Sequence, residues 1–195
     1  MLKLNLGCGF NQLQTHINVD KFPGCTPNEV VDLEKTPWPW ADSSASEICM
    51  THVLEHLGQN PEVFLAIVKE VYRVLAPDGV WNVVVPHPRH DDFLADPTHV
   101  RSITRTTMEM FDLKKNQEWI KAKYQTSPLA VMIGVDFELI SEKVTADDVW
   151  QGRVQRGEVN ESDLNHLVWH SNNIAREVSM VLRARKSLIS QGTYE

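Results

Sequence analysis

The stretch Leu4-Asn5-Leu6-Gly7-Cys8-Gly9, followed by Ile17-Asn18-Val19-Asp20, decides the fold of this chain. Each stretch contains a short apolar run, which predicts one strand over 3–7 and another over 17–20. Glycines at the end of the first strand allow a sharp turn and leave room for a ligand against the main chain. A carboxylate at the end of the second strand can accept hydrogen bonds from both hydroxyls of a ribose. Together these features predict a site for an adenosyl group.

Strands and helices alternate along the rest of the chain. The clearest helix is predicted from Pro61 to Leu75, where apolar residues recur every three or four positions. Shorter helices are predicted over 106–113 and 161–169. Further strands are predicted over 30–33, 47–51, 80–85, 137–144 and 178–184. This order favours a doubly wound, mostly parallel sheet with helices on both faces and a ligand at the carboxyl ends of its strands.

Composition excludes several classes of protein. The chain has 195 residues, which favours one domain, and a formal net charge of −7, which makes a nucleic-acid partner unfavourable. It contains no apolar stretch of bilayer length, and its first residues do not resemble a signal peptide. Cys8, Cys25 and Cys49 have no zinc or redox spacing, which suggests free thiols. We therefore expect a cytoplasmic protein that does not bind membranes.

The connection between the first two strands is unusually short. Only residues 10–16 separate the two strands, whereas a parallel crossover normally needs a dozen residues or more. The first crossover helix is therefore expected to be a single turn or absent.

Further motifs follow in a recognisable order. The chain resembles the class I S-adenosylmethionine (SAM)-dependent methyltransferases, and is most similar to their small bacterial type 11 group. The glycine bend and Asp20 carry this resemblance together with these motifs: Val31-Asp32-Leu33, Pro39-Trp40-Ala41-Asp42-Ser43-Ser44, Thr51-His52-Val53-Leu54-Glu55-His56-Leu57, the segment from Val71 to Gly79, and Phe137-Glu138-Leu139-Ile140.

The resemblance implies a Rossmann-like fold with seven strands, of which the last is antiparallel. It implies a single domain over 1–186, with lid or insert segments at 86–134 and 146–173. Residues 187–195 are expected to form a C-terminal tail.

The resemblance also implies a set of cofactor contacts. The methionine part of SAM would lie against the bend, Asp20 would hold the ribose, and the next strand end would border the adenine. The residues implied are Asn5, Gly7, Cys8, Gly9, Asp20, Asp32, Leu33, Thr51 and His52, the last two beside the transferred methyl group. Two alternatives stay open: Asp32 could cap a turn, and His52 could be a hydrogen-bonded histidine at a strand end.

The acceptor is expected to bind beside the irregular stretch 86–104, which is rich in proline, histidine and aspartate. Methyl transfer needs a base only where the acceptor must lose a proton early, and histidine suits that role. The candidate catalytic residues are His52, His87 and His99. Arg89 or Arg101 could pair with an anionic acceptor. Histidines and aspartates could also bind a metal, but their spacing matches no compact motif, so no metal is expected.

We therefore expect a SAM-dependent methyltransferase that modifies an oxygen or nitrogen atom of a small molecule, either sugar-like or anionic. One alternative is a non-catalytic binding or regulatory module with the same fold. A nicotinamide-dinucleotide oxidoreductase is less favoured, because a third glycine is missing and Asp20 comes only 11 residues after Gly9.

Overall fold

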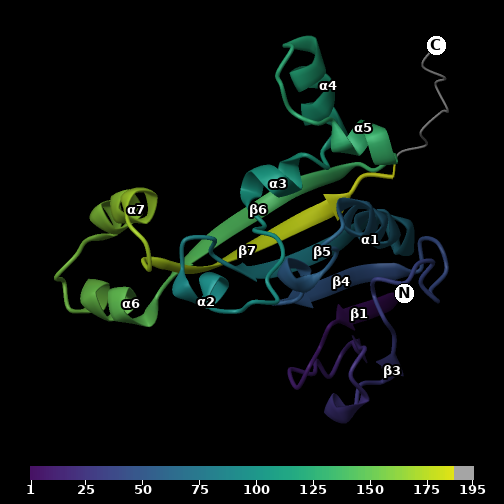
Figure 1. The fold of residues 1–195 in the computed structure, drawn as a ribbon, viewed down its shortest axis with the longest axis horizontal. Coiled ribbons are helices and arrows are strands. Elements are labelled where there is room, and N and C mark those ends of the chain that lie inside the picture. Colours follow the sequence, from purple (N-terminus) through teal and green to yellow (C-terminus); the bar gives the residue numbers. More distant parts are fainter. Residues whose placement is uncertain (187–195) are drawn as a thin grey trace.

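The computed structural model describes residues 1–186, so the predicted tail at 187–195 lies outside the described residues (Figure 1). The strands are β1 (Leu2–Leu6), β2 (Ile17–Asp20), β3 (Glu29–Val30), β4 (Ala45–Thr51), β5 (Leu75–Pro86), β6 (Phe137–Ala146) and β7 (Ala175–Ala184). The α-helices are α1 (Pro61–Val74), α2 (Asp91–Leu94), α3 (Arg105–Glu109), α4 (Leu113–Lys121), α5 (Leu129–Ile133), α6 (Asp148–Gln155) and α7 (Glu161–His170). Two short 3₁₀ helices are η1 (Pro23–Cys25) and η2 (Leu54–His56).

All seven strands form one sheet in the order β3-β2-β1-β4-β5-β7-β6. The pairs from β3 to β5 are parallel, and β7 is antiparallel to both β5 and β6. The predicted mostly parallel sheet with an antiparallel last strand is therefore confirmed. The strand order reverses at the β1–β4 pair, and ligands of such sheets bind in the crevice beyond the carboxyl ends of strands at that point.

Two predicted strands have different lengths in the structure. The predicted strand 30–33 is shortened to β3, because the Asp32 side chain accepts a hydrogen bond from the Glu34 amide (3.2 Å) and closes a turn. The predicted strand 80–85 is lengthened to β5, which begins immediately after α1. Its register against β4 shifts over Pro77-Asp78-Gly79, so the residues expected to end a helix instead form an irregularity inside a strand.

Helix α1 matches its predicted range to within one residue at its C-terminus. Pro61 occupies the first turn, as expected, and the Asn60 side chain caps the N-terminus by accepting a hydrogen bond from the Glu62 amide (2.8 Å). Tyr72 of α1 and Trp81 of β5 both pack against Phe137, with ring centroids 5.2 and 5.3 Å apart, respectively. The apolar face of α1 thus covers the centre of the sheet.

The buried Glu70 carboxylate of α1 joins the helix to the loop before β4. It accepts hydrogen bonds from the Trp38 amide (2.6 Å) and from Arg73 (2.7 and 2.8 Å). We expect Glu70→Gln to lower the free energy of unfolding by about 2 kcal/mol, because an amide presents only one acceptor to these donors. Urea denaturation measures this change, with the exposed Glu62→Gln as the control; equal stability of both variants would contradict the expectation.

Residues 10–16 contain no helix, which confirms the expectation for the first crossover. Hydrogen bonds from asparagine side chains hold this connection in place of a helix. Asn5 donates hydrogen bonds to the Asn11 carbonyl (3.0 Å) and to the Asn18 side chain (2.9 Å). The Asn18 side chain in turn accepts a hydrogen bond from the Leu13 amide (2.8 Å). Side-chain amides therefore fix a connection that is too short to fold by itself.

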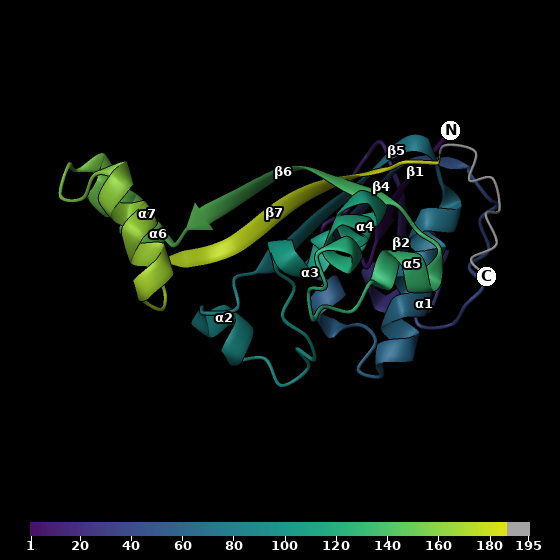
Figure 2. The same cartoon turned by 90° about the horizontal axis from the view of Figure 1, so that it is seen from above.

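The helices α1, α3 and α5 lie on the same side of the β5–β7–β6 part of the sheet (Figure 2). On the opposite face of the central strands, polar side chains such as Glu47, Cys49 and Asn82 are only partly buried. Lys3 forms an ion pair there with Glu47 (2.9 Å). This polar surface lies on the side that a helix in the first crossover would otherwise cover.

The two predicted insert segments contain more helix than expected. The predicted helix 106–113 is divided into α3 and α4, because the Asp112 side chain caps a new helix by accepting from the Lys115 amide (3.0 Å). The predicted helix 161–169 is α7, and α6 precedes it at the far end of the β6–β7 hairpin (Figure 1). None of the helices in residues 1–186 has the length and hydropathy that crossing a bilayer requires.

Candidate cofactor and acceptor site

The bend after β1 contains two glycines with positive φ angles, 68° at Gly7 and 49° at Gly9. A Cβ atom at Gly7 would lie 2.5 Å from a methyl carbon of Val53, so the fold itself requires glycine there. A Cβ atom at Gly9 would meet no atom of residues 1–186 within 4 Å, its chain neighbours apart. The first glycine thus allows close internal packing, and the second leaves open space for a ligand.

Asp20 ends β2 directly beside this bend. Its Oδ2 atom accepts a hydrogen bond from the Gly9 amide (2.8 Å), and its Oδ1 atom accepts one from the Phe22 amide (2.8 Å). The predicted proximity of the glycine bend and the carboxylate is therefore confirmed. Each carboxylate oxygen can accept a further hydrogen bond, which leaves capacity for the two hydroxyls of a ribose.

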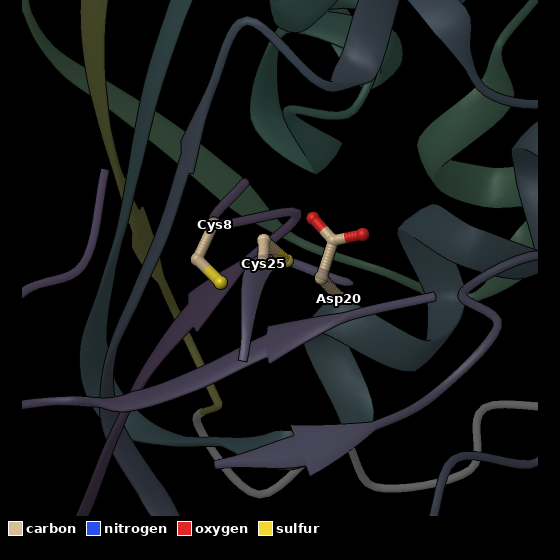
Figure 3. A group of neighbouring side chains, drawn as sticks. All are labelled: Cys8, Asp20 and Cys25. Atoms are coloured by element: carbon tan, nitrogen blue, oxygen red, sulfur yellow. The ribbon is translucent and has the colours of Figure 1, made fainter. Parts of the chain in front are cut away.

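Cys8, between the two glycines of the bend, has a buried side chain. Figure 3 shows Cys8, Cys25 and Asp20 together, from the bend after β1, from η1 and from the end of β2. Burial raises the pKa of the Cys8 thiol to about 11, so it stays protonated at neutral pH. The Cys8 side chain therefore contributes to internal packing, and contact of the cofactor with the Cys8 main chain remains a prediction.

Three other residues that were predicted to contact the cofactor form hydrogen bonds within the protein. The Asn5 amide group donates to Asn11 and Asn18, as described above, and its side chain is buried. Asp32 caps its own turn and forms an ion pair with Lys35 (3.2 Å), as the alternative interpretation expected. Leu33 is buried, and its carbonyl accepts a hydrogen bond from the Trp38 indole (3.0 Å). The contacts of these residues with the cofactor remain predictions.

The turn after β4 presents His52 at the edge of the sheet. Thr51 ends β4, and His52 follows with a φ of +53°, a conformation that costs a residue other than glycine about 1 kcal/mol or more. The His52 Nδ1 atom lies 3.6 Å from Glu55 Oε1, and its Nε2 atom lies 3.3 Å from Glu177 Oε2. The neighbouring Glu55 carboxylate, with a smaller contribution from Glu177, raises the pKa of His52 despite its partial burial.

A cavity of about 430 Å³ opens beside His52, at the carboxyl ends of β4 and β5. It is lined by His52, Glu55, His56, Pro86, Asp92, Asp96, His99, Thr145, Ala146, Asp148, Gln151, Arg176 and Glu177. The structure therefore brings His52 and His99, from the turn after β4 and the loop after β5, to one cavity. We call it the acceptor cavity.

No protein-family model matches this chain, and no curated protein matches it. Several solved structures do match its fold. A SAM-dependent methyltransferase from Archaeoglobus fulgidus aligns with a TM-score of 0.58 and 16% identity, over 93% of this chain and 86% of that one. One from Methanosarcina mazei aligns with a TM-score of 0.53 and 13% identity, over 93% and 91%. The [4+2]-cyclase SpnF aligns at 0.51 and 13%, over 93% and 74%.

The fold is that of class I SAM-dependent methyltransferases. Within this methyltransferase fold, the glycine bend, Asp20 and the end of β4 lie at the switch point of the sheet, as predicted.

The third candidate base, His87, lies apart from the other two. It lines a separate cavity of about 620 Å³, and burial lowers its pKa. Its amide donates to the Arg176 carbonyl (2.8 Å), so the residue extends the pairing of β5 with β7. Sequence proximity to His99 therefore did not bring the two histidines together, and we remove His87 from the candidate catalytic residues.

The two arginines expected to pair with an anionic acceptor are also engaged elsewhere. Arg89 donates to the carbonyls of Trp169 (2.6 Å) and Val168 (2.9 Å), which anchors α7. Arg101 donates to the Gly58 carbonyl (2.8 Å) and lies 4.1 Å from the centre of the Phe64 ring.

Sequence reasoning missed the residues that give the acceptor cavity its charge. Glu55 was read only as part of a family motif, and Arg176 was not singled out. Both line the cavity, because η2 and the β6–β7 hairpin meet there. Buried glutamate following a strand end was the available signal, since glutamate is rarely buried without a partner.

Proposed function

We propose that this chain is a SAM-dependent methyltransferase that acts on a small-molecule acceptor at an oxygen or nitrogen atom. The observation that carries the proposal is the 2.8 Å hydrogen bond between the Gly9 amide and the Asp20 carboxylate, beside the open space at Gly9. The bend, the carboxylate and the empty space form the receptor that an adenosyl group needs.

These residues fit the cofactor. SAM, when bound, supplies a methyl group that its sulfonium centre already activates for in-line displacement. Asp20 would accept hydrogen bonds from the ribose hydroxyls, while Gly9 would let the cofactor approach the main chain. Thr51 and His52 would lie beside the methyl group, since both occupy the end of β4. The protein would act mainly by positioning the reactants.

The charges of the acceptor cavity favour a hydroxyl-bearing or amine acceptor over an anionic one. Its lining includes five acidic side chains and one arginine, Arg176, which already pairs with Asp92 (3.0 Å) and Asp148 (3.3 Å). Carboxylates accept hydrogen bonds from sugar hydroxyls but repel anions. A sugar-like hydroxyl is therefore our preferred acceptor.

His52 and His99 are the proposed candidates for the base that a hydroxyl acceptor requires. His52 is half exposed at the cavity wall, where Glu55 and Glu177 would stabilise its protonated form. A proton taken from the acceptor would therefore be held close to two carboxylates.

Isothermal titration with S-adenosylhomocysteine (SAH), the demethylated product of SAM, tests cofactor binding. We expect one equivalent to bind with a dissociation constant below about 100 μM, and NAD at the same concentration not to compete. Absence of binding at millimolar SAH, or tighter binding of NAD, would contradict the proposal. A panel of sugars and amines with labelled SAM then tests transfer.

A non-catalytic or differently catalytic role is the second candidate. The missing first crossover helix leaves the methionine side of the site less enclosed, and one structure with this fold is named as a [4+2]-cyclase. SAH binding without methyl transfer to the acceptor panel would favour this candidate.

A further inference from the structure

Glu55 places an unpartnered carboxylate in the wall of the acceptor cavity. Its side chain is 1% exposed, and neither of its carboxylate oxygens has a hydrogen-bond partner among residues 1–186. Burying an ionised carboxylate without compensation costs several kcal/mol. Positive charge beside such a group stabilises it, and the half-exposed His52, whose Nδ1 atom lies 3.6 Å from Glu55 Oε1, offers such a charge only when it is protonated.

Two imidazole nitrogens face this carboxylate. His56 Nε2 and His99 Nε2 each lie 4.0 Å from Glu55 Oε1, beyond hydrogen-bonding distance. The two rings pack edge to face, with centroids 4.5 Å apart. All three potential ligand atoms lie within 4.8 Å of one another.

The hydrogen bond on the far side of His99 sets its tautomer. Its Nδ1 atom lies 2.8 Å from the Phe93 carbonyl oxygen, which can only accept a hydrogen bond. Nδ1 therefore carries the proton, and in the neutral ring Nε2 presents a lone pair toward Glu55.

The same argument holds for His56. Its Nδ1 atom lies 2.8 Å from the Thr98 hydroxyl, and that hydroxyl uses its single proton to donate to Asp96 Oδ1 (2.6 Å). Thr98 must then accept from His56, so Nδ1 carries the proton and Nε2 presents a lone pair. Outer hydrogen bonds of this kind are typical of histidines that bind metals.

Backbone hydrogen bonds hold the three groups in place. The Val100 amide donates to the Glu55 carbonyl (2.9 Å), which joins the loop after β5 to η2. His99 thus sits beside Glu55 and His56, although it lies 43 residues after His56 in the chain.

We propose that Glu55, His56 and His99 bind a divalent transition-metal ion. Three lone-pair atoms repel one another in the absence of a cation, and two imidazoles with one carboxylate suit zinc, iron(II) or manganese. The remaining coordination positions would face the acceptor cavity. The site does not depend on SAM; if the proposed function also holds, an acceptor hydroxyl would coordinate there and become more acidic, and the base would be His52, since His99 would be a ligand.

Two other groups of potential ligands are less suitable. Cys8 and Cys49 have pKa values raised mainly by burial, and thiols bind metals as thiolates. Their neighbouring carboxylates are also occupied, since Asp20 accepts from the Gly9 amide and Glu47 pairs with Lys3. Of the three groups, only the one at Glu55 combines a buried, unpartnered carboxylate with free nitrogen lone pairs.

Titration of the chelator-treated full chain with Zn²⁺, in the absence of SAM, tests the site. We expect one equivalent to bind with micromolar or tighter affinity, and His99→Gln and Glu55→Gln each to weaken it at least 100-fold. The control is His166→Gln, which disrupts the pair of histidines on α7 whose rings lie 4.3 Å apart. Unchanged affinity in both site variants, loss of binding in the control, or no binding by the wild type would overturn the proposal.

X-ray absorption spectroscopy of the zinc-loaded wild type identifies the metal ligands directly, so this test does not require any variant to fold. We expect nitrogen and oxygen ligands at about 2.0–2.1 Å, whereas a sulfur ligand at about 2.3 Å would overturn the assignment. SAH affinity of the metal-free protein distinguishes the two proposals. Zinc binding without SAH binding would support the metal site and contradict the proposed methyltransferase function. SAH binding without zinc binding would support the methyltransferase function and contradict the metal site.

Discussion

Replacing Asp20 with alanine is expected to weaken SAH binding at least 100-fold. The carboxylate lies 2.8 Å from the Gly9 amide and is the group placed to accept hydrogen bonds from both ribose hydroxyls. Each hydrogen bond to a charged group contributes about 1.5–3 kcal/mol, so losing two removes most of the affinity. Titration calorimetry of the variant against the wild type measures the loss.

Asp163→Ala is the control, because Asp163 is an exposed carboxylate on α7 that accepts a hydrogen bond from the Asn160 side chain (2.8 Å). We expect its affinity for SAH to stay within a few-fold of the wild type. Asp20 also accepts from two amides, so the melting temperature of Asp20→Ala must be recorded to show that it is folded. A folded Asp20→Ala with nearly unchanged affinity would refute the assignment of the ribose site.

Gly7→Ala is expected to destabilise the fold strongly, by about 2–4 kcal/mol. A methyl group there would collide with Val53 at 2.5 Å, and the φ of +68° disfavours any side chain. Gly9→Ala has the same backbone penalty but no collision, so it should cost only about 1 kcal/mol.

The two variants should separate folding from binding. Gly9→Ala is expected to remain folded and to lose SAH affinity at least tenfold, because its methyl group would occupy space that the cofactor needs. Urea denaturation and SAH titration of both variants check this. Equal destabilisation by both substitutions, or a Gly9→Ala protein that binds SAH normally, would show that the two glycines are equivalent.

The parts of the fold that local sequence determines were predictable. β2 has its predicted ends, and α1 has them within one residue. Pro61 marks the start of α1, whereas Pro77-Asp78-Gly79, which were expected to end it, lie inside β5. The absence of a helix from the first crossover followed from the small number of residues in it. The division of the helix predicted over 106–113 was not foreseen, although Asp112 is a strong capping residue, because the periodic pattern continued through it.

The site was less predictable than the fold. The bend and Asp20 were found because their positions follow from consecutive parallel strands. The cluster of Glu55, His56 and His99 was not foreseen, because its assembly depends on a backbone hydrogen bond between distant segments. His87 was misplaced for the related reason that residues near one another in an irregular loop can face different cavities.

The hydrogen bond from the Val100 amide to the Glu55 carbonyl also connects the proposed acceptor cavity with the segment that packs on the glycine bend. Glu55 follows two residues after Val53, whose methyl groups rest on Gly7. Any displacement of the β5 loop by an incoming acceptor would therefore be transmitted through η2 to the cradle of the adenosyl group. Such mechanical coupling would make each ligand alter the affinity for the other, and by thermodynamic reciprocity the effect would be the same in both directions.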